Sequence, residues 1–342
     1  MISKILRWFL YALLATLVAL ALLGEFFYLA AERREIADNH TAAPAYGRFV
    51  KAGDVNLYIQ EWGPSTGTPI VLVHAAGGWS GVWQTTGEAL AAHGYHVIAP
   101  DMPPLGFSDR PDSPRYSRAD QAARLVALLD ALKIPRAVFV GHSFGARAVA
   151  EVAINNPDRV SGIVFVDAAL GLQSTSSPLL ADILAPKIIR RAITAATLSN
   201  PAFTKTLLDK FVANPDTATP EWVSIYQAAL NVKGTTNATA DWLPTLVAEQ
   251  GQFKSKDPAN YRAIKAPTLI LWGEADSVTP ISQGRFLESL IKGAQFQSIP
   301  AVGHLPPIEV TKEFDDALLK FLDTHKTLLA KGAACAPGVM CS

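Results

Sequence analysis

Short apolar runs alternate with amphipathic stretches along most of this chain. The runs suit strands of a parallel sheet that is covered on both faces, and the stretches between them show the 3.6-residue period of helices. A strand–turn–strand pattern over residues 47–63 comes first. The predicted strands are Ile70–His74, His96–Pro100, Ala137–Gly141, Gly162–Asp167, Thr268–Gly273 and Gln295–Ile299, and the main predicted helices are Ser117–Leu132, Phe144–Asn156 and Val310–His325. This alternation predicts an α/β fold with a mostly parallel, doubly wound sheet.

One interval breaks the alternation. Residues 171–263 contain no convincing buried strand, and their periodicity is helical throughout. Pro201 and Pro220 each suit the first turn of a helix. The expected helices are Leu179–Ala196, Pro201–Val212, Pro220–Val232 and Ala240–Gln250. We therefore predict a helical insertion between two strands of the sheet.

The N-terminal segment is too apolar to belong to this pattern. Residues 8–24 carry no charge, and FFYLAA extends the apolar stretch to Ala31. At about 1.5 Å per residue, seventeen helical residues reach ~26 Å, close to the ~30 Å of a bilayer core. A cleaved signal peptide is the main alternative, but the run is longer than usual and no good cleavage site follows it. A buried core helix is a weaker alternative, because every face is apolar. We predict a single transmembrane helix over residues 8–31.

The orientation of this helix is weakly determined. Lys4 and Arg7 precede it and Arg33 and Arg34 follow it, so the basic flanks nearly balance. Large C-terminal domains are often translocated whatever their flanking charge. Cys335 and Cys341, in a Gly/Pro/Ala-rich tail, would suit a disulfide in an oxidising compartment, or are two free thiols. We expect the folded domain outside the cytoplasm.

Composition excludes several classes of protein. The 342 residues are 49% hydrophobic and 18% charged, which excludes a disordered chain. The net charge is zero, from 30 basic and 30 acidic residues, so the basic excess of a nucleic-acid binder is missing. Two cysteines cannot form a disulfide framework or a four-thiolate zinc site. The composition fits a globular enzyme.

The strongest local motif is the segment GHSFG at residues 141–145. It follows the apolar run AVFV and opens a helix rich in small residues. This is the G-x-S-x-G pattern in its strand–turn–helix context, in which a tight turn presents the serine hydroxyl above the strand end. We predict that Ser143 is a nucleophile.

A serine nucleophile needs a base, and the base needs an acid. Asp276 follows one predicted strand and His304 follows the last one, so both lie where the active sites of open parallel sheets assemble. Glu274, two residues before Asp276, and Asp167, at the end of FVD, compete as the acid, and Asp167 is the second candidate. We predict a triad of Ser143, Asp276 and His304.

Acyl transfer also requires donors for a developing oxyanion. The amide of Phe144 directly follows the predicted nucleophile, and the amide of Ala76 lies in the loop HAAGG after the first buried strand. We predict these two amides as the oxyanion hole, with a merely flexible turn as the alternative for HAAGG.

Together these motifs resemble the α/β-hydrolase superfamily, in its capped serine-hydrolase branch, over about residues 47–325. LVHAAGG with Trp83 resembles the oxyanion loop and its tryptophan, and PDMPPLGFSD resembles the segment after the fourth strand. GHSFGA resembles the elbow, LWGEAD the acid motif and VGHLPPIE the histidine ending. The resemblance implies the same triad and oxyanion pair, a helical cap roofing the substrate pocket, and no metal or organic cofactor.

Two departures bear on this resemblance. Ala75 stands where the family usually has glycine, which leaves the shape of the oxyanion loop open, and Pro104 stands where it often has glycine. The serine at position 143 separates the chain from members that use an aspartate nucleophile.

The sequence thus predicts a membrane anchor at 1–35, a linker at 36–46, a core at 47–170 and 264–328, a cap at 171–263 and a flexible tail at 329–342. We expect hydrolysis of a carboxylic ester or similar apolar acyl compound, with Trp222 and Trp242 of the cap touching the substrate. A C–C bond hydrolase, lactonase, amidase or lyase on the same triad is the alternative, as is a ligand-binding member without activity.

Overall fold

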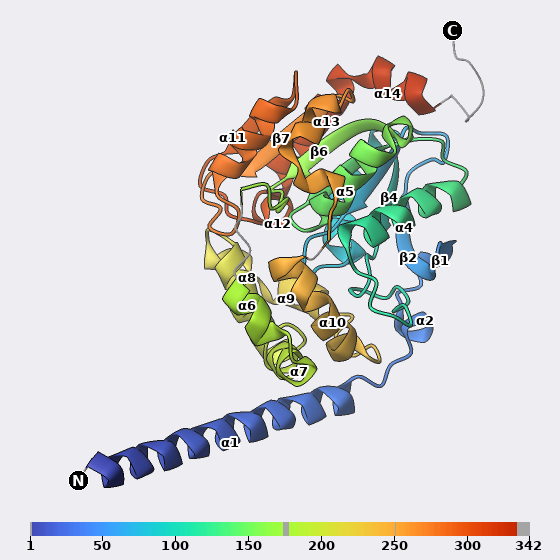
Figure 1. Cartoon of the computed structure of the whole chain (residues 1–342). Coiled ribbons are helices and arrows are strands. Elements are labelled where there is room, and N and C mark those ends of the chain that lie inside the picture. Colours follow the sequence, from blue (N-terminus) through green and yellow to red (C-terminus); the bar gives the residue numbers. More distant parts are fainter. Residues whose placement is uncertain (1, 174–177, 250, 334–342) are drawn as a thin grey trace.

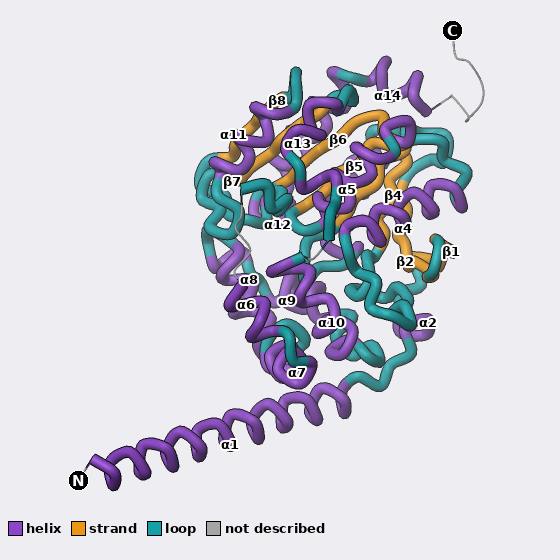
Figure 2. The backbone as a smooth tube through the Cα atoms, viewed as in Figure 1, coloured by secondary structure: helices purple, strands orange, loops and turns teal. Residues whose placement is uncertain are grey.

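The computed structural model describes residues 2–173, 178–249 and 251–333. Within them, eight strands form one sheet in the order β1-β2-β4-β3-β5-β6-β7-β8 (Figures 1 and 2). β2 runs antiparallel to both β1 and β4, and the remaining neighbours are parallel. The strands are β1 Gly47–Ala52, β2 Val55–Trp62, β3 Pro69–Val73, β4 His96–Pro100, β5 Ala137–His142, β6 Val160–Val166, β7 Thr268–Gly273 and β8 Gln295–Ile299. The predicted α/β fold is confirmed.

Helices cover both faces of the sheet because its strands alternate apolar side chains between the faces. Val71 and Val73 of β3 point to the face that α4, α5 and α11 cover, whereas Ile70 and Leu72 point to the face that α3, α13 and α14 cover. The covering helices are α3 Gln84–Ala92, α4 Arg118–Ala131, α5 Gly145–Asn155, α11 Ile281–Leu290, α13 Thr311–Thr324 and α14 Lys326–Ala333, with the short α12 Pro306–Glu309 before α13.

The segment between β6 and β7 is helical and lies over the carboxyl ends of the parallel strands (Figure 1). Its α-helices are α6 Pro178–Leu184, α7 Lys187–Ala196, α8 Thr204–Phe211, α9 Pro220–Gln227 and α10 Thr235–Ala248. The predicted helix over 179–196 is two helices, because Pro186 is extended and caps α7. The last helix begins earlier than predicted, since Gly234 in the left-handed region precedes Thr235.

Buried polar contacts fix this helical insertion to the core. Arg118 of α4 donates to Glu249 at 2.8 Å and to Ser255 at 2.9 Å, and both side chains of the ion pair are almost fully buried. Arg147 of α5 donates to the carbonyls of Ala169, Thr245 and Leu246. A buried pair of this kind is costly to break from one side, so it holds the two parts in one arrangement.

The N-terminal helix α1, Ile2–Arg34, projects from the body (Figure 1). Residues 4–34 are apolar and long enough to cross a membrane, and most of their large side chains are exposed. The segment predicted as a linker contains one helical turn, α2 Asn39–Ala42, because Asp38 accepts hydrogen bonds from the amides of His40 and Thr41.

The C-terminal end differs from the predicted tail. α14 continues through Ala333, and Leu329 is buried where the missing side chain of Gly162 on β6 leaves room. Cys335 and Cys341 lie outside the described residues.

Candidate active site

Ser143 lies on a sharp turn between β5 and α5. Its φ is +50°, a left-handed conformation that costs a non-glycine residue about 1–3 kcal/mol and is found at functional sites. The two glycines of the motif permit the turn: a Cβ on Gly141 would lie 2.7 Å from Ala146, and one on Gly145 would lie 2.5 Å from the carbonyl of His74. The GHSFG pattern is therefore a packing requirement, and it presents Ser143 at the strand end.

His304 lies in the loop after β8. Gly303 is packed so closely beneath the end of α8 that a Cβ would lie 2.6 Å from the amide of Ala213. Glu309 accepts hydrogen bonds from the amides of Gly303 and Leu305, each at 3.0 Å. The backbone amide of His304 donates to the carbonyl of Phe211 at 2.7 Å. The helical insertion therefore helps to position this histidine.

Asp276 follows β7 and is 7% exposed. Its Oδ1 accepts from the amides of Val278 and Thr279, and its Oδ2 accepts from the Thr279 hydroxyl at 2.6 Å. Burial by itself would raise the pKa of this carboxyl, but the hydrogen bond and charge of His304 and the bonds from Thr279 hold it below its usual value. Asp276 is thus kept as a carboxylate.

The three side chains form one hydrogen-bonded chain. Ser143 Oγ lies 2.7 Å from His304 Nε2, and His304 Nδ1 lies 2.7 Å from Asp276 Oδ2. All three residues are less than 9% exposed. A cavity of about 330 Å³ nonetheless reaches Ser143 and His304, between the HAAGG loop and the helical insertion. Asp276 can therefore fix the ring with Nδ1 protonated, which leaves Nε2 free to accept a proton from Ser143.

Asp167, the alternative acid, lies beside this chain. It follows β6, is fully buried and has a φ of +42°. Its Oδ1 accepts from the amide of Gly273 at 2.9 Å, and its Oδ2 has no hydrogen-bond partner among the described residues. Burial, and next the charge of Asp276, raise the pKa of Asp167 well above its usual value. The structure bonds Asp276 to His304 and gives Asp167 no such bond.

Asp167, Asp276 and His304 could together face a cation, since one donor atom of each lies within 4.8 Å of the others. His304 Nδ1 and Asp276 Oδ2 are bonded to each other, however. A metal ion would have to replace that hydrogen bond, so the donors fit a triad better than a metal site.

The two predicted oxyanion donors are backbone amides without an acceptor among the described residues. Ala76 lines the cavity next to Ser143, and Phe144 is the residue after it. His74 orders the loop that carries Ala76: its Nδ1 lies 2.9 Å from the carbonyl of Ala75, and its Nε2 accepts from the amide of Met102 at 2.8 Å. Burial lowers the pKa of His74 to about 4, so the ring is neutral and can act as donor and acceptor at once.

His142, next to Ser143, is hydrogen-bonded to the loop that carries His304. Its Nε2 donates to the carbonyl of His304 at 2.7 Å. Burial, and next the nearby His304, lower the pKa of His142 to about 3. The folded chain therefore keeps this ring neutral under conditions in which an unfolded chain would protonate it.

Replacement of His142 should change how stability depends on pH. With a folded pKa of about 3 and an unfolded value near 6.5, the stability that neutral His142 supplies is complete above pH 6.5 and is lost as the pH falls. His142→Gln removes this titration, so between pH 6 and pH 4 the wild type should lose about 1.4 kcal/mol per pH unit relative to the variant. Urea unfolding of both detergent-solubilised chains measures this difference, and parallel pH profiles would show that His142 is not buried as a neutral ring.

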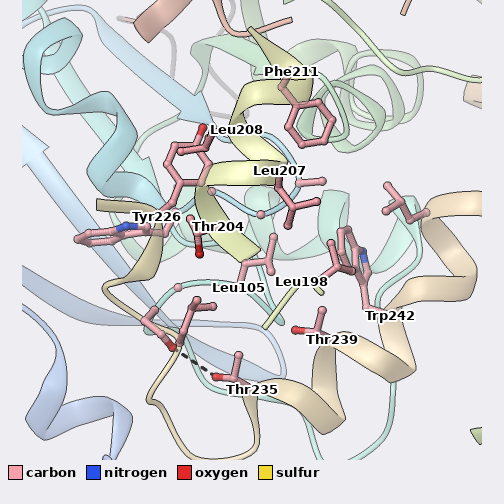
Figure 3. A pocket seen from close by; sticks show the side chains of 18 of the residues that line it. Leu105, Leu198, Thr204, Leu207, Leu208, Phe211, Tyr226, Thr235, Thr239 and Trp242 are labelled. Atoms are coloured by element: carbon pink, nitrogen blue, oxygen red, sulfur yellow. Dashed lines mark hydrogen bonds between the residues drawn. The ribbon is translucent and has the colours of Figure 1, made fainter. Parts of the chain in front are cut away.

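A second cavity, of about 110 Å³, extends under the helical insertion (Figure 3). Its wall is mainly apolar and includes Leu105, Leu198, Leu207, Leu208, Tyr226, Trp242 and Leu246. Ala76, Phe211, Tyr226 and Leu246 line both cavities, so the apolar space continues toward Ser143.

The structure separates the two tryptophans predicted to touch substrate. Trp242 lines the apolar cavity, packs edge-on against Phe144 at 5.0 Å between ring centroids, and has no acceptor for its buried Nε1–H among the described residues. Trp222 packs instead against the cluster of Leu208, Val212, Ala218, Leu305 and Ile308, and lines neither cavity. Tyr226, four residues later on the same side of α9, packs against this cluster too, and it also lines both cavities.

Comparison with known proteins agrees with this architecture. Residues 68–310 match the family model described as alpha/beta hydrolase fold. The chain belongs to the α/β-hydrolase fold family. Among curated relatives, this α/β-hydrolase is 30% identical over 280 residues to the 2-hydroxy-6-oxo-2,4-heptadienoate hydrolase of Pseudomonas putida strain F1, covering 81% of this chain and 96% of the relative.

Two solved structures give the same picture. The meta-cleavage product hydrolase CumD from Pseudomonas fluorescens IP01 is 25% identical, with a TM-score of 0.66 and coverage of 82% of this chain and 98% of that one. An N-acyl homoserine lactone degrading enzyme is 28% identical, with a TM-score of 0.65 and coverage of 80% and 100%. The chain is thus a serine hydrolase of this fold, and its similar proteins act on more than one kind of bond.

Several residues of the site were not predicted from the sequence. Thr279 was detectable, because a threonine three residues after an aspartate often closes a turn on that carboxylate. His74 and His142 are hydrogen-bonded beside the serine, and their positions at the ends of predicted strands did not indicate these bonds. Arg110 lines the apolar cavity, and nothing in its local sequence indicated that.

Proposed function

We propose that this α/β-hydrolase cleaves a bond next to a carbonyl group through an acyl-enzyme on Ser143. The serine oxygen bonds to the carbonyl carbon as its proton passes to His304 Nε2. The amides of Ala76 and Phe144 hold the oxyanion, and Asp276 stabilises the imidazolium. The oxyanion then collapses and the leaving group departs with the proton from His304. Water, activated by His304, releases the acyl part as a carboxylic acid and restores Ser143. The hydrogen-bonded chain from Ser143 to Asp276 is the observation that carries this proposal.

Carbon–carbon bond hydrolysis is the first candidate for the bond that is cleaved. The curated relative described above is named for a 2-hydroxy-6-oxo-dienoate. In such a compound the departing carbon can take the electron pair, because the conjugated keto form spreads that charge to a second carbonyl. The sequence motifs led us to expect an ester, whereas the similarity to this relative favours the carbon–carbon bond.

Arg110 is a feature of the site that also favours a dienoate as substrate. It lines the apolar cavity, and it makes no ion pair within 4 Å among the described residues. Its Nη atoms donate to the carbonyls of Ser108 and Gly106 and to the hydroxyl of Thr235, while its buried Nε has no partner there. Asp101, Glu35 and Asp109 act on the Arg110 charge from beyond ion-pair distance. A cation in the wall of a mainly apolar cavity favours a substrate with an apolar body and one carboxylate, as a dienoate has.

Replacement of Arg110 should therefore weaken the turnover of an acid more than that of its ester. For Arg110→Gln we expect kcat/KM for a 2-hydroxy-6-oxo-dienoate to fall about 10- to 100-fold further than kcat/KM for its methyl ester, since a hydrogen bond to a charged group contributes about 1.5–3 kcal/mol. The two substrates are compared on the same variant, so any general loss of folding cancels. Equal losses for both would remove Arg110 as the carboxylate partner.

Hydrolysis of an ester or lactone is the second candidate, favoured by the apolar wall around Tyr226, Trp242 and Leu246. We propose that Trp242, with its free Nε1–H, contacts the substrate in either case. A panel of a 2-hydroxy-6-oxo-dienoate, medium-chain acyl esters and acyl lactones, each measured as kcat/KM, decides between the two candidates. A dienoate value well above the others would support carbon–carbon hydrolysis, and the reverse order would support ester hydrolysis.

We also propose that α1 anchors the enzyme in a bilayer, with the catalytic domain outside the cytoplasm. The rest of the chain does not cover the apolar part of α1, and exposure of so large an apolar surface to water would be unfavourable. A helix of this length and composition is the form in which a chain crosses hydrocarbon.

Fractionation should show this anchor directly. The full chain should stay in the membrane pellet after washing with high salt and with alkaline carbonate. A chain that begins at Gly24 should leave the pellet under the same washing and keep its turnover of a soluble ester, because it retains Arg34 and Glu35, which bond to Ser199 and Thr236. Recovery of a soluble protein that has lost α1 by natural cleavage would identify a signal peptide instead.

A further inference from the structure

The cap exposes large aliphatic side chains on α7, which packs against α1, and on the preceding helix α6. On α7, Ile188 is 73% exposed, and Ile189 and Ile193 are each more than a third exposed. On the preceding helix α6, Leu179 is 69% exposed and Ile183 is 46% exposed. We call these five residues the aliphatic face. So many neighbouring large aliphatic side chains on the surface of a soluble domain mark an interaction site.

The aliphatic face adjoins α1. On α7, Ile188 and Ala192 are four residues apart, as are Ile189 and Ile193, so all four share one side of the helix. Gly24 of α1 packs against this side, since a Cβ on Gly24 would lie 2.9 Å from the Cβ of Ala192. Figure 1 shows α7 beside the C-terminal part of α1, and α6 on the far side of α7.

Polar contacts fix α1 to the cap beyond this point. Tyr28 donates to Asn237 at 3.2 Å, and Arg191 of α7 lies over the Tyr28 ring at 5.6 Å. Arg34 donates to the carbonyl of Ser199, and buried Glu35 accepts from the amide of Thr236 at 3.0 Å. The cap therefore cannot swing freely about α1.

The level of the bilayer surface follows from the sequence of α1. The uncharged residues 8–24 span about 26 Å of helix at 1.5 Å per residue, close to a hydrocarbon core of ~30 Å, and the basic residues Lys4 and Arg7 precede them. The first acidic residue, Glu25, comes directly after Gly24. Because Gly24 contacts Ala192, α7 lies at this boundary.

The distribution of charged side chains on α7 agrees with a position at the bilayer surface. Lys187 and Arg190 lie on the side of α7 that faces Asp241 of the cap, away from Ile188 and Ile189. Basic residues on one side and bulky aliphatic residues on the other are typical of a helix that lies in the membrane interface.

We propose that the aliphatic face rests in the interfacial layer of the same bilayer that α1 spans, and that it holds the mouth of the cap at the membrane. This proposal relies on the anchor proposed above. The segment after α7 supplies Leu198 and Thr204 to the wall of the apolar cavity, so an apolar substrate dissolved in the bilayer would enter a cap that already touches it.

The depth of single labels in liposomes tests this directly. The full chain, with Cys335 and Cys341 changed to serine, is reconstituted in vesicles of phosphatidylcholine and phosphatidylglycerol. It carries either Ile188→Cys or Leu328→Cys, labelled with an environment-sensitive nitrobenzoxadiazole dye. Leu328 on α14 is the matched control, since it is a 60% exposed leucine on a helix that Figure 1 places far from α1.

We expect the dye at position 188 to emit at shorter wavelength and to be quenched by lipids spin-labelled near the headgroup, and the dye at position 328 to show neither effect. Equal, weak quenching at both positions would overturn the proposal. A shift at position 188 that depends on protein concentration and not on the spin-labelled lipid would overturn it as well, because the face would then cover a second copy of the chain. Carbonate washing of the same vesicles reports on α1 separately, so failure of the anchor and failure of the face are distinguishable.

A second measurement connects the face to turnover. The double variant Ile188→Glu, Ile193→Glu should stay in the carbonate-washed pellet and keep its turnover of a short soluble ester. Its turnover of an acyl substrate dissolved in the vesicles should fall about tenfold or more, since two buried aliphatic contacts with lipid are lost. Unchanged turnover of the vesicle-borne substrate would contradict a role for the face in substrate entry.

Discussion

Ser143→Ala is expected to lower kcat by more than about 10³-fold, the scale observed when one member of a serine triad is removed. Only the serine oxygen lies within hydrogen-bond distance of His304 Nε2 among the described residues, so alanine leaves the base without a nucleophile to activate. The substitution removes one buried oxygen from a site whose shape is set by Gly141 and Gly145, so the fold should persist. Steady-state kinetics on the preferred substrate of the panel measures the loss.

Thermal unfolding of Ser143→Ala provides the control. Stability near that of the wild type is expected, because alanine keeps the Cβ and the positive φ of the turn and removes only one buried hydroxyl. Turnover within tenfold of the wild type in a folded Ser143→Ala chain would exclude the proposed acyl-enzyme.

Asp276→Asn should lower kcat by up to about 10⁴-fold, because asparagine can present an amide N–H to His304 Nδ1 and so favour the wrong tautomer of the ring. Asp167→Asn should have a much smaller effect. The pKa of Asp167 is already raised by burial and by Asp276, so the protonated acid is favoured, and neutral asparagine resembles it.

The pair of variants serves as its own control, since both replace a buried carboxyl with an amide of the same shape within 4.8 Å of His304. Comparison of kcat for the two, with Tm measured alongside, assigns the acid. A large loss from Asp167→Asn with little loss from Asp276→Asn would show that the hydrogen bond from Asp276 is not the one used in catalysis.

The sequence predicted the sheet well because its central strands are defined by local composition. β4, β7 and β8 have the predicted bounds, and β3, β5 and β6 differ by one or two residues at their ends. The GHSFG elbow was legible for a related reason. A Cβ at Gly141 or Gly145 would lie 2.5–2.7 Å from neighbouring atoms, so a sequence that forms this turn needs glycine at both positions.

The interior of the helical insertion was less predictable, because its helices end for local reasons and face one another across long distances in sequence. Pro186 divides one predicted helix, and Gly234 sets the start of another. Trp222 and Trp242 have the same chemistry, and only the packing of α9 and α10 turns one toward Leu305 and the other toward the cavity.

The position of the cap relative to α1 also could not be predicted from local sequence patterns. The long apolar helix was visible in composition, but its contact with α7 depends on Gly24 and Ala192, which are 168 residues apart in the chain. Arg110 is a similar case, since only the fold places it in the wall of the cavity that leads toward Ser143.

Labelling with a fluorophosphonate probe, followed by peptide mapping of the adduct, tests the central claim most directly. The probe phosphorus bonds to an activated serine oxygen, so it reports on nucleophile activation without knowledge of the substrate. We predict one adduct, on Ser143, which is absent from Ser143→Ala and greatly slowed in His304→Gln. A stable adduct on any other serine, or none on folded wild-type enzyme, would contradict the account.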